Sequence, residues 1–182
     1  MFMSLKLLKL RWKIFFWTIT GKINKFQSRL QLTLTQGNPE KILIIFPSDE
    51  PSFRVAYYTF RDLGKRSEHK ANFIFLVKGQ FKDLFNLRLG ETIYLNDSNP
   101  GGMLSDERSL LAVLKLQQFD IIVDLNSIFH LGISRLVSLL NSDMKVGFES
   151  DFSDRFYNIQ LDISKSGIME KGFKQINWIL AQ

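Results

Sequence analysis

Two acidic residues and a serine lie in a turn between an expected strand and an expected helix. The apolar run Ile42–Phe46 is typical of a buried parallel strand, and Val55–Leu63 has a helical pattern. The turn between them contains Asp49, Glu50 and Ser52, whose side chains could accept a proton or cap a helix. In α/β proteins, substrates bind beside turns that follow the carboxyl ends of strands. This turn, however, has two prolines and no glycine, unlike a phosphate-binding turn.

A second group of polar residues follows the apolar run Ile121–Leu125, which is the clearest strand in the sequence. Asp120 and Asp124 flank this run, about 13 Å apart in an extended chain, which is too far to share a proton or a metal ion. Asp124 lies at the carboxyl end and is the better candidate for a site, with a loop-capping role as its alternative. For His130 we expect a structural role, or a place at the edge of a ligand, rather than catalysis. The residues of a possible cleft are Ser52, Asp124, Asn126, His130 and Phe148.

Composition excludes several kinds of chemistry. The 182 residues include no cysteine, which rules out disulfides, thiolate-bound metal centres and a cysteine nucleophile. Two histidines are too few for a histidine-rich metal site, and no glycine-rich phosphate loop is present. We therefore expect no metal and no cofactor. A hydrophobic content of 45% is normal for a globular domain.

Charge is distributed unevenly along the chain. Residues 1–39 contain seven of the 24 basic residues and none of the 18 acidic residues, whereas the remainder has 17 basic and 18 acidic residues. The net charge of +6 therefore belongs to an N-terminal arm. The Gly37-Asn38-Pro39 turn predicts a division into a basic, amphipathic helical arm (1–36) and a domain (37–182).

The arm has helical periodicity over about seven turns, with apolar residues at positions 5, 8, 12, 15, 19, 23, 26 and 30. Its longest uncharged run, Ile14–Gly21, is too short to cross a bilayer. We expect a helix in the membrane interface, on the cytoplasmic side, with its aromatic residues at headgroup depth. The alternatives are packing on a partner protein or on the domain itself, and then nucleic acid, for which no second basic patch is present. The residues expected to contact the membrane or a partner are Lys6, Lys9, Arg11, Trp12, Lys13, Phe15, Phe16, Trp17, Lys22, Lys25 and Arg29.

After residue 40, strand-like and helix-like segments alternate. Strands are expected at Ile42–Phe46, Asn72–Val77, Thr92–Leu95, Ile121–Leu125 and Lys145–Gly147; helices are expected at Val55–Leu63, Gln80–Leu87, Ser105–Gln117, Leu131–Leu140 and Glu170–Ala181. Repeated strand–helix units predict an α/β fold, a Rossmann-like parallel sheet with helices on both faces.

Several short motifs in this order resemble family 9 glycosyltransferases of the heptosyltransferase type. They are Phe119-Asp120, Asp124-Leu125-Asn126-Ser127, Lys145-Val146-Gly147-Phe148, and Arg155-Phe156-Tyr157-Asn158, with Tyr58–Leu63 resembling the family's first helix. The resemblance covers residues 41–181 and implies the N-terminal half of a two-domain, GT-B type enzyme. Because Met169–Ala181 resembles the end of that half, the resemblance implies a truncated chain without the nucleotide-sugar domain.

The turn after the first strand departs from the family's pattern. The family's S-x-G-D turn supplies an aspartate, the proposed general base; here Pro51 falls on the glycine and Ser52 on that aspartate. A serine hydroxyl cannot act as a base near neutral pH without a helper, so Asp49 and Glu50 are the remaining, weak catalytic candidates. The simpler interpretation of Ser52 is a helix N-cap.

These observations favour a non-catalytic glycosyltransferase-like domain that acts as a membrane-surface binding or scaffold subunit of a protein complex. One alternative is the acceptor-binding half of a split glycosyltransferase acting on a lipid or saccharide. Another is an accessory subunit of a membrane-embedded electron-transfer or photosynthetic complex. In each case we expect a protein partner, and neither nucleic acid nor a cofactor of the chain's own.

Overall fold

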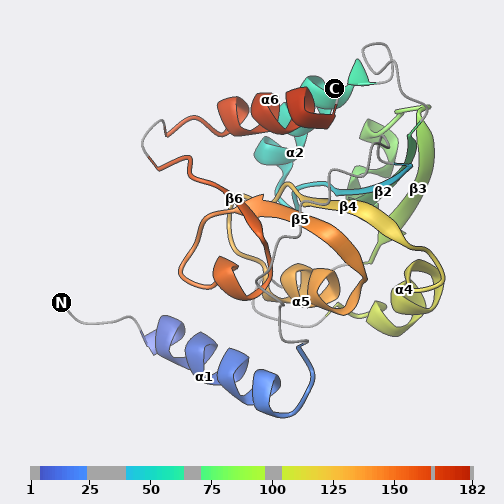
Figure 1. Ribbon diagram of the computed structural model, residues 1–182. Coiled ribbons are helices and arrows are strands. Elements are labelled where there is room, and N and C mark those ends of the chain that lie inside the picture. The colour runs from blue at the N-terminus through green and yellow to red at the C-terminus, as the bar shows by residue number, and fades with distance from the viewer. Residues whose placement is uncertain (1–4, 24–39, 64–70, 97–103, 165–166, 181–182) are drawn as a thin grey trace.

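A parallel sheet of six strands forms the centre of the protein (Figure 1). The computed structural model describes residues 5–23, 40–63, 71–96, 104–164 and 167–180. The strand order is β3-β2-β1-β4-β5-β6, and all neighbouring pairs are parallel. The strands are β1 (Lys41–Ile45), β2 (Asn72–Lys78), β3 (Gly90–Leu95), β4 (Phe119–Asp124), β5 (Ser142–Phe148) and β6 (Ile159–Leu161). This arrangement confirms the predicted Rossmann-like α/β fold.

Helices cover both faces of the sheet. On one face lie α2 (Glu50–Phe60) and α6 (Met169–Leu180), and on the other lie α4 (Glu107–Leu114) and α5 (Leu131–Leu139) (Figure 1). Two short 3₁₀ helices, η1 (Gly79–Leu84) and η2 (Ser153–Arg155), lie in the connections. Among the described residues a further helix, α1 (Leu5–Ile19), lies beyond α5 as an additional layer (Figure 1).

Alternation along the central strands produces two apolar cores. Ile42 and Ile44 of β1 pack with residues of α2 and α6, whereas Leu43 and Ile45 pack with residues of α4 and α5. Both faces of the strand are buried, as expected for a central strand of a parallel sheet. A run such as Ile42–Phe46 therefore has no polar alternation, and its continuous apolar character identified it as a strand.

Several elements differ from the prediction. The helix expected at Gln80–Leu87 is the 3₁₀ helix η1, and the sequence did not predict β6. The first domain helix begins at Glu50 instead of Val55, because Asp49 caps it through a 2.9 Å hydrogen bond from the backbone N–H of Ser52. The prediction of Ser52 as the N-cap was therefore wrong.

The N-terminal helix is shorter than the periodicity predicts, because it ends at Ile19. Gly21 adopts a left-handed conformation, with φ of 68°. The backbone N–H of Lys22 donates to the carbonyl of Trp17, and that of Gly21 donates to the carbonyl of Thr18. These two bonds form a Schellman motif, which terminates helices at a glycine. Residues 24–39, which include the predicted boundary at 36 and 37, lie outside the described part.

Candidate functional site

The carboxyl ends of β1 and β4 meet at the point where the strand order reverses. The chain passes from β1 to β2 on one side of β1, and β4 pairs with the other side of β1. In that pair, Ile45 is in register with Asp124. Ligands of open α/β sheets bind in the crevice at this switch point. This edge of the sheet is therefore the place where the predicted cleft would lie.

Asp124 is the centre of a buried hydrogen-bond network at the switch point. Its side chain Oδ1 accepts bonds from the backbone N–H and the Nδ2 of Asn126, at 2.9 and 2.7 Å. Its Oδ2 accepts a 2.5 Å bond from the hydroxyl of Tyr157, which also lies 2.9 Å from the hydroxyl of Ser134. Only 2% of Asp124 is exposed. The network thus ties β4 to α5 and to the segment after η2.

Burial raises the pKa of Asp124 above its usual value of 3.8. The hydrogen bonds from Tyr157 and Asn126, and the nearby His130, act in the opposite direction but do not offset the desolvation. Burial and the neighbouring carboxylate also raise the pKa of Tyr157 well above its usual value. A carboxyl group of raised pKa at a switch point is a typical functional-site feature, although structural networks produce the same shift.

The β1–α2 turn is fastened to this network through Asn126. The Oδ1 of Asn126 accepts a 2.9 Å bond from the backbone N–H of Ser48. In the same turn, the carboxylate of Asp49 is the N-cap of α2, and the exposed carboxylate of Glu50 forms an ion pair with Arg54 at 2.7 Å. The two weak catalytic candidates therefore have structural partners, one as a helix cap and the other as a surface ion pair.

The structure brings together only part of the predicted cleft. Asp124, Asn126 and His130 lie at the same edge of the sheet, and His130 caps α5 by accepting a 3.4 Å bond at Nδ1 from the backbone N–H of Ile133. Ser52 lies buried in the first turn of α2. Phe148 lies elsewhere, in the core below α6, where its ring packs against Phe173 at 5.8 Å.

Sequence reasoning did not select Tyr157 or Ser134. Tyr157 is part of the Arg155–Asn158 motif, so a signal was present, but its contact with Asp124 spans 33 residues. Only the fold brings these two side chains together. Among the described residues, no group of three or more His, Asp or Glu side chains could hold a metal ion.

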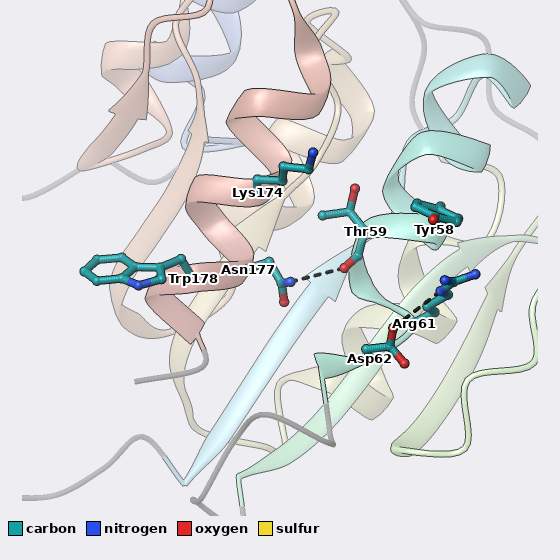
Figure 2. A pocket seen from close by; sticks show the side chains of 7 residues that line it. All are labelled: Tyr58, Thr59, Arg61, Asp62, Lys174, Asn177 and Trp178. Carbon is teal, nitrogen blue, oxygen red and sulfur yellow. Dashed lines mark hydrogen bonds and ion pairs between the residues drawn. The ribbon is translucent and has the colours of Figure 1, made fainter.

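A separate hollow of about 410 Å³ lies between α2 and α6 (Figure 2). Figure 2 shows Asn177 of α6 directed toward α2, where its Nδ2 donates to the carbonyl of Thr59 at 3.1 Å. Arg61 and Asp62 form an ion pair at its rim, and the guanidinium of Arg61 lies 4.1 Å from the ring centre of Tyr58. The part of α2 that lines the hollow is its C-terminal end, whereas its N-terminal end follows the carboxyl end of β1. The hollow therefore lies away from the switch point.

The N-terminal helix has two apolar faces. One face packs on the domain through Ile14 and Trp17, which belong to the same core as α4 and α5. The other carries large apolar side chains that are exposed: Leu5, Leu8, Trp12, Phe15, Phe16 and Ile19. Positions 5, 8, 12, 15 and 19 of the predicted stripe therefore lie on the outer face of α1, and the inner face of the helix consists of residues that the stripe omits. Ile23, which the stripe includes, lies beyond the helix and is buried in the same core as Ile14 and Trp17. No helix among the described residues is long and apolar enough to cross a membrane.

Most of the predicted membrane-contacting residues lie on or beside this outer face. Lys6, Lys9, Arg11 and Lys22 are exposed, while Lys13 is half-buried. Trp17 differs: it is only 6% exposed, because at 100° per residue it lies across the helix from Trp12 and faces α5. Lys25 and Arg29 lie outside the described residues.

Solved structures of glycosyltransferases share this fold. The chain superimposes on an E. coli heptosyltransferase WaaC with ADP-2-deoxy-2-fluoro heptose, with a TM-score of 0.58, 15% identity, and coverage of 75% of this chain and 47% of that chain. For the glycosyl transferase family 9 structure from Veillonella parvula, the TM-score is 0.61 at 12% identity, over 79% and 41% of the two chains. For the E. coli ADP-heptose lps heptosyltransferase II the values are 0.58 and 17%, over 75% and 40%.

The likeness is one of fold. The predicted resemblance to the heptosyltransferase fold is confirmed as a partial, GT-B-like domain. The chain spans less than half the length of each of these structures. No protein-family model and no curated protein sequence matches the chain.

Proposed function

We propose that this protein binds the cytoplasmic surface of a membrane through α1, and that its glycosyltransferase-like domain serves as a non-catalytic binding or scaffold subunit. The observation that carries the proposal is the outer face of α1. Six large apolar side chains are exposed there, on a helix whose opposite face is already occupied by the domain. Contiguous apolar patches of this kind on soluble monomers mark interaction surfaces.

The charges of α1 favour anionic lipid as the partner of this face. The helix carries Lys6, Lys9, Arg11 and Lys13 and no acidic residue. At 100° per residue, the lysines lie on one flank of the outer face and the arginine lies on the other. Basic side chains beside an apolar face suit the membrane interface, where each contributes about 1 kcal/mol near an anionic surface. Full burial of each apolar side chain would contribute about 1.5–3 kcal/mol.

The non-catalytic part of the proposal is supported by the hydrogen bonds and the ion pair that the acidic residues around the switch point already form. Asp49 caps α2, Glu50 pairs with Arg54, and Asp124 accepts three hydrogen bonds while nearly fully buried. A general base must reach the proton that it abstracts, within about 3 Å. Each of these carboxylates would have to leave its present partners to do so.

Vesicle sedimentation tests the membrane part. The protein should sediment with vesicles that contain phosphatidylserine and remain in the supernatant with phosphatidylcholine alone, and rising salt should weaken the binding. Equal binding to both vesicle types would show that charge plays no part. An absence of binding to phosphatidylserine vesicles at low salt would contradict the proposal.

A second candidate function is the acceptor-binding part of a glycosyltransferase whose donor domain is another chain. The shared fold and the polar residues at the switch point favour it. Calorimetry with nucleotide-sugars, on the protein alone and on its native complex, separates the two functions. We expect no measurable heat of binding in either sample. Micromolar binding by the complex, together with sugar transfer that is lost in Asp49→Asn or Glu50→Gln, would establish the second function instead.

A further inference from the structure

Arg135 of α5 connects three segments of the protein that are far apart in sequence. Its side chain is buried, its Nε donates a 2.9 Å bond to the carbonyl of Lys22, and its guanidinium forms an ion pair with the buried Glu107 of α4. The guanidinium carbon also lies 5.3 Å from the ring centre of Trp17. One side chain therefore binds α1, the turn that ends α1, and α4.

These contacts fix the rotation of α1 about its own axis. Trp17 lies close to both Arg135 and Lys13, whose Nζ is 4.9 Å from the centre of the indole ring. With Trp17 and Ile14 facing inward, Trp12 and Phe16 must face outward, because they lie on the opposite side of the helix. All residues from Leu131 to Ser138 of α5 are buried, consistent with a helix that has the sheet on one side and α1 on the other.

Exposed apolar and basic side chains also occur on α4 and in the residues that follow it. Leu116, two residues beyond the end of α4 at Leu114, is 88% exposed, and Val113 of α4 is also exposed. The segment from Arg108 to Phe119 contains two basic residues and no acidic residue. The face formed by α2 and α6 differs in charge, because Arg54, Arg61 and Lys174 there each form an ion pair with an acidic residue.

We infer that the domain lies on anionic lipid in one fixed orientation. The outer faces of α1 and α4 contact the lipid, the hollow between α2 and α6 remains in water, and Arg135 is the positioning residue that holds the arm and the domain in this relation. This inference rests on the proposed membrane function. It adds a second contact surface, on α4, and it leaves the α2–α6 face accessible to a soluble partner.

Single-cysteine labelling tests the orientation, because the chain has no cysteine of its own. We choose three exposed positions: Phe16→Cys on α1, Leu116→Cys beyond α4, and Gln175→Cys on α6. Each is labelled with a nitroxide, and its accessibility to oxygen and to a water-soluble nickel complex is measured on phosphatidylserine-containing vesicles. Labels at positions 16 and 116 should become accessible to oxygen and protected from nickel. The label at position 175 should remain accessible to nickel, as it is without vesicles.

The outcomes separate this inference from the proposed function. A label at position 16 that stays in water would overturn the membrane function itself. If the label at position 16 enters lipid while that at position 116 stays in water, or while that at position 175 enters lipid, attachment stands and the orientation is overturned.

The role of Arg135 is tested in the same assay. The double variant Arg135→Gln/Glu107→Gln replaces the buried ion pair by two neutral amides, so that neither residue leaves an unpaired charge. In this variant the label at position 16 should stay in lipid, while the label at position 116 should lose its protection from nickel. Arg54→Gln, on the α2 face, is the control and should leave both labels unchanged. Unchanged protection at position 116 in a folded double variant would overturn the positioning role. If the double variant does not fold, Arg135→Lys takes its place, because lysine keeps the charge beside Glu107 but lacks the Nε donor to the carbonyl of Lys22. The label at position 116 should again lose protection, and unchanged protection there would overturn the positioning role.

Discussion

The hydroxyl of Tyr157 donates a 2.5 Å hydrogen bond to Oδ2 of Asp124, and both residues are buried. Asp124 ends β4 and Tyr157 follows η2, so the bond joins the centre of the sheet to the segment that leads into its edge strand β6. Of the three hydrogen bonds to this carboxylate, it alone comes from a residue distant in sequence. The side chain of Asp124 therefore links the segments that meet where the strands end.

Removing the hydroxyl of Tyr157 should destabilise the protein. Tyr157→Phe leaves Oδ2 of Asp124 buried without this donor, and an unsatisfied buried acceptor costs about 1–3 kcal/mol. Urea unfolding measures the loss. Tyr58→Phe, at an exposed position on α2, is the matched control and should change stability by less than about 0.5 kcal/mol. Equal stabilities of the two variants would contradict the structural role of the bond.

Asp124 should also affect the dependence of stability on pH. Its pKa is raised in the native state, so the native protein keeps a proton that the unfolded chain loses near pH 3.8. Between that pH and the raised native pKa, stability should fall as pH rises, by up to about 1.4 kcal/mol per pH unit. Asp124→Asn cannot titrate, so the stability of the natural protein relative to this variant should decrease with pH through that window. An increase would mean that the native pKa is lowered.

Asp49 should act as a helix cap. In Asp49→Ala, α2 loses the bond to the N–H of Ser52, and the protein should lose about 1 kcal/mol of stability. Arg54→Ala removes only an exposed ion pair with Glu50 and should cost about 0.2–0.5 kcal/mol. Thermal unfolding of both variants under one set of conditions gives the comparison. A smaller loss in Asp49→Ala than in Arg54→Ala would contradict the capping role.

The regular elements could be predicted because their signals are local. Runs such as Ile42–Phe46 and Ile121–Val123 are continuously apolar because both faces of a central parallel strand are buried. The three-residue strand β6 has no such run, and its residues are only half-buried at the edge of the sheet. Its pairing with β5 depends on the fold and could not be read from the sequence.

The candidate site was predicted in part, for the same reason. Asp124, Asn126 and His130 follow one strand closely, so their proximity is a local property of the chain. The contribution of Tyr157 depends on tertiary contact, and only its place in a short motif pointed to it. Phe148 ends β5 near the same edge, but its side chain points into the core below α6.

The apolar stripe predicted for the N-terminal helix describes one of its two apolar faces and omits the other. Positions 5, 8, 12, 15 and 19 form one face, as predicted, and that face is exposed. Leu10, Ile14 and Trp17 form a second apolar face, which the single stripe omits and which packs on the domain. The glycine at position 21 was also a signal for the end of the helix, because a left-handed residue terminates it there.

The central claim, that the outer face of α1 binds lipid, is tested most directly by two matched tryptophan substitutions. Trp12 on α1 and Trp178 on α6 are exposed to nearly the same degree, 65% and 66%, so their removal changes the total exposed apolar surface equally. The measurement is the fraction of protein that sediments with phosphatidylserine-containing vesicles. We predict that Trp12→Ala lowers the partition coefficient by about tenfold or more, and that Trp178→Ala leaves it unchanged. Equal binding by the two variants, or a loss in Trp178→Ala alone, would contradict the account.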